Sequence, residues 1–262
     1  MSDALSGVWE NAFGSKMSIS VQGNTLSGIY TSHTGSSGAY QLVGRCSTKS
    51  PSVKHGQSVA IAIYWKNTEQ GVRDNSWHWA GSMSGQLQVD GKMTLTNSIV
   101  VSVPFESYQK GNYVDELVFT KTNHSLAADI SCTPESDLSK DLEPPVYPIA
   151  GKWLSVSDEA VLGISDIKAI SGETVATLAT PNKTIQLSGF VDVDADEHQA
   201  QSIALVGCCS TTDESFSASG MLNVGSEYLT LYTWVAELTT PQDCFMQTRM
   251  ISMTFKKCTN YA

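Results

Sequence analysis

The sequence has few charged residues and lacks any long apolar run. Only 16% of its 262 residues are charged, and 26 aspartates and glutamates outnumber 16 lysines and arginines, which gives a net charge of -10. No stretch approaches the ~18 consecutive apolar residues that a membrane-spanning helix needs. The basic residues are scattered, so the chain offers no positive stripe to a phosphate backbone. We therefore expect a soluble globular protein that binds neither membranes nor nucleic acids.

Motifs of catalysis are also missing. The sequence has no GxSxG nucleophile elbow, no HExxH motif and no phosphate-binding glycine loop. Its five histidines are dispersed over the chain, at positions 33, 55, 78, 124 and 198. Dispersed residues can converge in a folded enzyme, but the pattern itself indicates no catalytic or metal site. We predict a protein that is not an enzyme and uses no catalytic cofactor.

Cysteines are few, and none forms a CxxC pair. Because their number is even, disulfides fit better than a zinc site, with buried reduced thiols as the alternative. The N-terminus has no basic and apolar signal segment, so the protein either stays inside the cell or has lost a leader. We expect a secreted protein whose leader has been removed, in which sequons at Asn123 and Asn182 could carry glycans. The six cysteines are at positions 46, 132, 208, 209, 244 and 258.

What the chain has in abundance is alternation of apolar and polar residues. This period of two is typical of half-buried strands, and turn signals such as Gly23-Asn24 and Asp90-Gly91 separate the runs. Many short antiparallel strands build a sandwich or a barrel, and closing the sheet removes exposed edges. We predict an all-β fold made of barrels. Clear examples of the alternation are residues 17–21, 59–63 and 93–95.

The chain reads as a duplication. An acidic stretch rich in proline and serine at 123–148 interrupts the pattern, and we predict a linker there between domains at 1–122 and 149–262. Similar segments recur on its two sides, twice at an offset of 144 residues (149 − 5 and 201 − 57). The matched pairs are Leu5–Trp9 with Ile149–Trp153, Gln57–Ile61 with Gln201–Leu205, and Leu117–Lys121 with Ser252–Lys256.

Short motifs in the first half point to one family. In chain order they are Gly7-x-Trp9-x-Asn11-x-x-Gly14-Ser15, Leu26-Ser27-Gly28-x-Tyr30-x-Ser32, Tyr64-Trp65-Lys66-Asn67, Trp79-x-Gly81 and Phe119-Thr120-Lys121. With its spacing, this series resembles the avidin and streptavidin family over nearly all of residues 4–122. The resemblance implies two tandem eight-stranded antiparallel up-and-down β-barrels, the second degenerate, with a biotin-type site at one open end.

The resemblance also implies roles for individual residues. Asn11, Ser15 and Tyr30 match donors to the ligand's carbonyl oxygen, and three such donors in a cavity with little water can stabilise a partly anionic oxygen. Ser32 matches an acceptor for a ring nitrogen. The remaining candidate ligand-binding residues are Thr34, in a loop over the ligand, Trp65 and Trp79, as aromatic walls, and Asn75 and Trp77. Core packing is the alternative role for Trp79.

Several positions depart from the family. Ile99 or Ser98 stands where the family has a tryptophan of the seventh strand, and Leu117 where it has an aspartate or asparagine of the last strand. Asp115 would restore a carboxylate only through a shift of two residues. Trp77 replaces a small threonine, so its volume should crowd the site. Gln109 aligns with the tryptophan that a neighbouring subunit supplies. These changes leave the identity of the ligand open.

The second copy has lost the family's polar residues. Ser155 stands for Asn11, and Cys209 for Trp65. Asp158 and Glu159 replace Gly14 and Ser15. Apolar residues could still line a cavity there, with Trp234 as a seventh-strand tryptophan and Phe216 opposite Trp77. Cys244 and Cys258 flank one predicted hairpin and could cross-link it.

Three functions from different classes fit these observations. The leading one is non-catalytic binding of biotin, or of another cyclic ligand with a carbonyl group, in the first barrel. A larger apolar ligand such as a carotenoid or other pigment is the first alternative. A storage or structural protein with decayed pockets is the second. Because barrels of this family pair through broad sheet faces, we expect a homodimer that forms a pseudo-tetramer of barrels, or a larger assembly.

Overall fold

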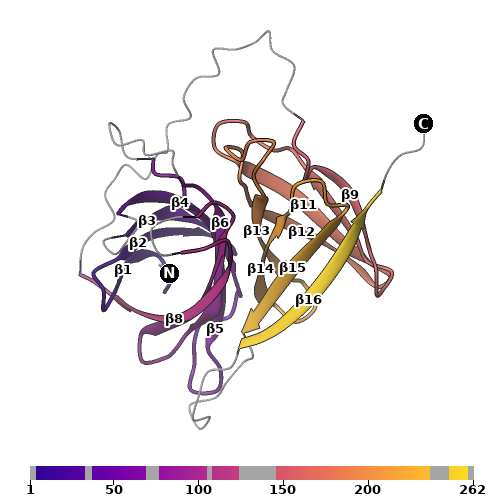
Figure 1. Cartoon of the computed structure of the whole chain (residues 1–262). Coiled ribbons are helices and arrows are strands. Elements are labelled where there is room, and N and C mark those ends of the chain that lie inside the picture. The colour runs from indigo at the N-terminus through magenta and orange to yellow at the C-terminus, as the bar shows by residue number, and fades with distance from the viewer. Residues whose placement is uncertain are drawn as a thin grey trace.

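The computed structural model describes residues 4–32, 37–68, 77–104, 108–123, 146–236 and 248–258. These residues form two closed barrels, each of eight antiparallel strands (Figure 1). This confirms the predicted fold class and the tandem organisation. The strands of the first barrel are β1 (Gly7–Asn11), β2 (Lys16–Gln22), β3 (Thr25–Ser32), β4 (Gly38–Cys46), β5 (Gln57–Tyr64), β6 (Ala80–Leu87), β7 (Lys92–Val101) and β8 (Gly111–Lys121).

The second barrel has the same topology. Its first strand lies between its second and its last, which closes the sheet. The strands are β9 (Gly151–Ser155), β10 (Val161–Ser165), β11 (Glu173–Thr180), β12 (Lys183–Val191), β13 (Gln201–Cys209), β14 (Glu214–Leu222), β15 (Tyr228–Ala236) and β16 (Thr248–Lys257). Most of the predicted linker, residues 124–145, lies outside the described residues.

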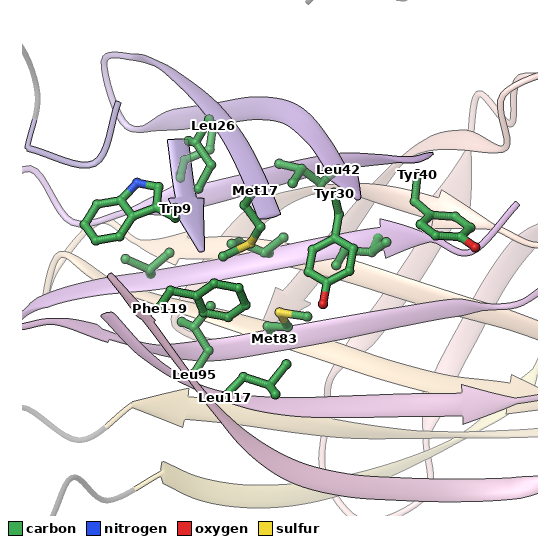
Figure 2. Packing of buried hydrophobic residues seen from close by; sticks show 14 of the residues in the cluster. Trp9, Met17, Leu26, Tyr30, Tyr40, Leu42, Met83, Leu95, Leu117 and Phe119 are labelled. Carbon is green, nitrogen blue, oxygen red and sulfur yellow. The ribbon is translucent and has the colours of Figure 1, made fainter. Parts of the chain in front are cut away.

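Each barrel has its own apolar core, built from one face of every strand. Figure 2 shows this interior for the first barrel, where Trp9, Met17 and Phe119 lie close together and Tyr40 lies far from Trp9. The interior residues follow the period of two, because successive side chains of a strand point to opposite faces of the sheet. Trp9 and Phe119 are both fully buried at the end of the barrel where β1 pairs with β8.

The duplication is visible in matching contacts. Trp9 donates its indole hydrogen to the carbonyl of Leu5 at 2.8 Å, and Trp153 donates to the carbonyl of Ile149 at 3.0 Å. A lysine from the last strand lies over each indole ring, at 5.6 Å in the first barrel and 5.5 Å in the second. These two cations are Lys121 and Lys257.

This pairing corrects the predicted alignment of the last strands. Trp9 is opposite Lys121, and Trp153 is opposite Lys257. The counterpart of residues 117–121 is therefore 253–257 and not 252–256. The error of one residue matters, because it would turn every side chain of β16 to the wrong face of the sheet.

The two barrels pack against each other through small side chains. The outer faces of β5, β6, β13 and β14 meet, so these strands are buried on both sides. Residues 59–63 are consequently fully buried, whereas their alternation predicted a half-buried strand. Serine pairs bridge the contact, with Ser58 3.1 Å from Ser215 and Ser98 3.0 Å from Ser219. Its apolar part consists of Ala60, Ala62, Tyr64, Ala80, Phe190, Ala204 and Val206.

A buried polar network borders this contact. His78 Nδ1 of the first barrel lies 2.8 Å from both carboxylate oxygens of Asp192, which is fully buried in the second. The Tyr64 hydroxyl donates to Asp194 at 2.8 Å, and Lys66 pairs with the same carboxylate at 2.8 Å. Within this network, polar groups of one barrel are thus paired with polar groups of the other, as buried polar groups generally are.

The cysteines and sequons give a mixed result. The four cysteines within the described ranges, at 46, 208, 209 and 258, are not joined in disulfides. Cys132 and Cys244 lie outside those ranges, so the structure shows none of the predicted disulfides. Asn123 and Asn182 are exposed, as glycan acceptors must be. Secretion stays a prediction. No helix among the described residues is long and apolar enough to cross a membrane.

Candidate functional site

The turn between β1 and β2 builds the first part of the site. The Oδ1 atom of Asn11 accepts hydrogen bonds of 3.0 Å from the backbone N–H groups of Phe13 and Ser15. Gly14 takes a φ of 81°, a left-handed conformation that glycine adopts without strain. Since the amide oxygen of Asn11 is occupied by the turn, its NH2 end is the part left to act as a donor. Asn11 and Ser15 are both buried.

Tyr30 joins these two residues from β3. It pairs with Met17 of the neighbouring strand, which directs its side chain into the barrel. Burial raises the pKa of the Tyr30 hydroxyl, and the charge of Asp115 raises it further, while hydrogen bonds with Ser15 and Asn11 act in the opposite direction. The phenol is therefore protonated at neutral pH and is available as a hydrogen-bond donor.

A cavity of about 340 Å³ opens beside these donors. Five of its lining residues are aromatic, and five others carry amide, aliphatic hydroxyl or carboxylate side chains. It holds six of the nine predicted ligand-binding residues, since Asn11, Ser15, Tyr30, Ser32, Trp65 and Trp79 all line it. The remaining lining residues are Phe13, Asn97, Ile99, Val101, Tyr108, Asp115 and Leu117. Thr34 and Asn75 lie outside the described residues.

Trp65 and Trp79 form the aromatic wall. The Trp65 ring meets Tyr30 edge-on, with 5.3 Å between centroids, a favourable arrangement for aromatic pairs. Gly81 makes room for it, because a Cβ atom there would lie 2.9 Å from Nε1 of Trp65. The glycine of the Trp-x-Gly motif is thus explained by the packing of the other tryptophan.

Trp77 is the predicted site residue that does not line the cavity. It is buried in the core behind the wall, with its ring 5.1 Å from Trp79 and 6.0 Å from Tyr40. The expected crowding of the site by this large side chain is therefore not seen in the cavity lining. Trp77 instead supports Trp79 from behind.

The structure also resolves the positions that departed from the family. Ile99 lines the cavity, whereas Ser98 points outward to Ser219 of the second barrel. Leu117 and Asp115 both line the cavity, because they are two residues apart on one strand and share a face. Phe13, Asn97, Val101 and Tyr108 were not predicted from the sequence. Alternation along β7 could have identified Asn97 and Val101, since both share the parity of Ile99.

The second barrel has lost the three donors. Trp9 pairs with Met17, and its counterpart Trp153 pairs with Leu162, so Leu162 corresponds to Met17. Met17 pairs in turn with Tyr30, and Leu162 with Leu178, which makes Leu178 the counterpart of Tyr30. In the first barrel, the N–H of Asn11 donates to the carbonyl of Ser15, four residues later. In the second barrel, the N–H of Ser155 donates to the carbonyl of Ala160, five residues later, so this turn ends one residue later than predicted. The counterparts of the amide, hydroxyl and phenol donors are therefore Ser155, Ala160 and Leu178.

Its interior is filled differently as well. Ile63 pairs with Gly81 in the first barrel, whereas Gly207 pairs with Phe216 in the second. Phe216 is thus the counterpart of Gly81 and not of Trp77. Gly207 leaves room for the Phe216 ring, because a Cβ atom at Gly207 would lie only 2.7 Å from that ring. Trp234 does not face the interior, because it alternates with Leu231 and Val235, which do.

This fold and this cavity define a class: a closed antiparallel barrel with a cavity lined by polar and aromatic side chains. Residues 2–122 match the Avidin family, so the first barrel is an avidin family domain, and the second is a barrel of the same kind in tandem. The members of this family are non-catalytic binding proteins. A comparison with curated proteins found no match to the chain. Within the described residues, no group of three His, Cys, Asp or Glu side chains could hold a metal ion.

Proposed function

We propose that the first barrel binds, without catalysis, a small cyclic molecule through its carbonyl oxygen, with biotin as the first candidate. The observation that carries this proposal is the convergence of Asn11, Ser15 and Tyr30 at one cavity wall. All three side chains can donate a hydrogen bond. The Oδ1 atom of Asn11 is engaged by two N–H groups of the turn, so its NH2 group is the part that can bind the ligand. Donors held in place by packing bind an oxygen well because little ordering remains to be done on binding.

The size of the cavity favours a compact ligand over a pigment. Sites for drug-sized molecules span roughly 300–1,000 Å³, and about 340 Å³ lies at the lower end of that range. Trp65 and Trp79 would cover the apolar faces of a ring seated on the donors.

The second barrel serves, in this proposal, as a partner in assembly. It lacks the donor set, and its outer face covers β5 and β6 of the first barrel. Its contact supports β5, which ends next to Trp65, and β6, which begins next to Trp79 and contains Gly81. The chain would thus keep one binding barrel and one supporting barrel.

Titration with biotin tests this function. The protein is first analysed by native mass spectrometry as purified from its source, and tryptophan fluorescence is then followed as biotin is added. We expect a saturable change with one biotin per chain, because two tryptophans line the cavity. Absence of saturation, together with a different co-purified small molecule, would show that the barrel has changed its ligand.

A matched pair of variants assigns the binding to the donors. Tyr30→Phe removes one donor, and we expect about tenfold weaker binding, the effect of losing one hydrogen bond to a buried oxygen. Tyr232→Phe, on the outer face of β15, is the control and should bind like the wild type. Equal affinities of the two variants would exclude Tyr30 from the site.

A further inference from the structure

The aromatic wall of the cavity and the contact between the barrels are built from the same short segments of chain. Trp65 lines the cavity, whereas its neighbours Tyr64 and Lys66 bond to the second barrel. Trp79 also lines the cavity, and the residue before it, His78, bonds to the second barrel. Each segment thus presents one side chain to the cavity and an adjacent one to the second barrel, as successive residues of an extended chain do.

Asp192 of the second barrel contacts both of these segments and a third. Its carboxylate is fully buried, lies 2.8 Å from Nδ1 of His78 and accepts a hydrogen bond of 3.2 Å from the Tyr64 hydroxyl. Ser102, which follows the cavity residue Val101, donates to it at 3.4 Å. These partners hold the carboxylate firmly, because an unpaired charge away from water is costly. One side chain of the second barrel therefore connects three segments that carry cavity residues.

His78 fixes the segment that carries Trp79. It stands between Trp77 and Trp79, just before β6, and is buried. The rings of these two tryptophans lie 5.1 Å apart. The carbonyl of Trp79 accepts a hydrogen bond of 2.8 Å from the backbone N–H of Trp65. A shift of the His78 side chain therefore moves Trp79 and, through this hydrogen bond, Trp65.

The duplication provides an internal comparison. Phe216 is the counterpart of Gly81, so three residues earlier in each barrel (216 − 213 and 81 − 78) the pairing residues also correspond. Asp213 is thus the counterpart of His78. It bonds to the N–H and hydroxyl of Thr48 in the first barrel, at 2.9 and 2.8 Å, and Thr48 is exposed. A buried pair of ionisable side chains therefore lies behind the barrel that has kept the donors, and an exposed contact lies behind the barrel that has lost them.

We propose that Asp192 positions the aromatic wall of the first barrel through His78, so that the contact between the barrels regulates ligand binding. Asp192 is a positioning residue, because it is not among the residues that line the cavity and acts through its partners. The inference rests on the proposed function, since it takes the cavity as the ligand site. It assigns to the second barrel a role in controlling the affinity of the first.

Protonation of His78 controls the strength of this contact. The charged and titratable groups around it are the carboxylates of Asp192 and Asp194, the ammonium group of Lys66 and the hydroxyl of Tyr64. Burial lowers the pKa of His78, but the two carboxylates outweigh this effect and raise it above its ordinary value of about 6.5. Because loss of the proton removes the attraction between charges, we expect biotin affinity to fall as pH rises through the folded-state pKa. Bound biotin should raise that pKa in return.

NMR spectra of the ligand-free full chain provide the first test. The indole N–H signals of Trp65 and Trp79 are followed as the pH is raised, together with the ring signals of His78. We expect the indole signals to shift with the midpoint of His78. In Asp192→Asn both midpoints should move down together, because the carboxylate that favours the protonated imidazole is gone. Indole signals that do not follow His78 in the wild type would overturn the inference, and this titration needs no substitution.

Biotin affinities of variants provide the second test. Asp192→Asn and His78→Gln should each weaken binding roughly fivefold, an effect typical of residues that couple to a site without contacting the ligand. Because Asp192 acts through His78, the double variant should bind like His78→Gln alone. Asp213→Asn, at the counterpart contact between the barrels, is the matched control and should bind like the wild type.

The inference and the proposed function fail in different ways. Equal losses of affinity in Asp192→Asn and Asp213→Asn, or additive losses in the double variant, would overturn the inference and leave ligand binding intact. If the wild type does not bind biotin while its indole signals follow His78, biotin is excluded as the ligand and the positioning of the wall stands. A pH dependence of biotin affinity that disappears in His78→Gln, with Asp213→Asn unchanged, supports the inference.

Discussion

His78 of the first barrel and Asp192 of the second form a buried pair, with Nδ1 2.8 Å from the carboxylate. Burial of His78 works against its protonation, but the hydrogen bond and charge of Asp192, together with the charge of Asp194, outweigh that effect and raise the pKa of His78. The carboxylates of the second barrel thus favour the protonated form of this imidazole of the first barrel.

This pair makes stability depend on pH. Because the folded-state pKa of His78 lies above its unfolded value of about 6.5, its contribution is complete below that pH and is lost as pH rises through the folded-state pKa. We expect the urea midpoint of the wild type to fall over this range, and His78→Gln to flatten the profile. His198→Gln, at an exposed site, should behave like the wild type. A flat wild-type profile would contradict the expectation.

Gly81 should be essential to the shape of the cavity. In Gly81→Ala the new methyl group would lie 2.9 Å from Trp65 Nε1 and 3.1 Å from the carbonyl of Ser98. Trp65 must shift, so we expect several-fold weaker biotin binding and a changed fluorescence spectrum, with the barrel still folded. Gly111→Ala is the matched control, because its nearest neighbours are 4.0 Å away. Unchanged binding in Gly81→Ala would show that the wall tolerates the shift.

Cys209 should react with alkylating reagents at unusually low pH. Hydrogen bonds from Thr211 and Thr212 are the main cause of a pKa near 6, and Lys183 Nζ lies 3.2 Å from the sulfur. We expect the rate of iodoacetamide labelling, followed by peptide mass spectrometry, to rise with a midpoint of about 6. Thr211→Val should move the midpoint up. The pKa of neighbouring Cys208 is raised, chiefly by burial, so it should label only at alkaline pH.

A homodimer or larger assembly stays a prediction, and sedimentation tests it. Val114 and Val118 are exposed on the outer face of β8, away from the second barrel of the same chain. We expect twice the mass of one chain, or more, at micromolar concentration. Charged substitutions at these two valines should lower that mass if this face is the contact. A wild-type mass equal to one chain would contradict the assembly.

Local patterns predicted the fold and much of the site. The alternation of β2 and β7, the repeated Gly-x-Trp segments and the donors Asn11, Ser15 and Tyr30 could be recognised because each depends on neighbours along the chain. Positions set by partners distant in the chain were missed. Residues 59–63 showed no sign that a second barrel covers their outer face.

Strand register explains the remaining errors. Sequence similarity placed Phe216 opposite Trp77 and shifted β16 by one residue, whereas backbone pairing fixes both positions. The turn after Ser155 is one residue longer than the turn after Asn11, and so the alignment missed Ala160 as the counterpart of Ser15. Asn97 and Asp115 belong together only because β7 and β8 pair, a contact that no short motif records.

The contact between β5, β6, β13 and β14 joins two barrels of a single polypeptide. Separate subunits with such an interface dissociate on dilution, but a covalent connection fixes the effective concentration of each barrel around the other. The part of the first barrel next to Trp65 and Trp79 therefore stays in contact with the second barrel at any protein concentration. Ligand capture by a solitary, highly diluted chain would then be as strong as capture in a concentrated solution.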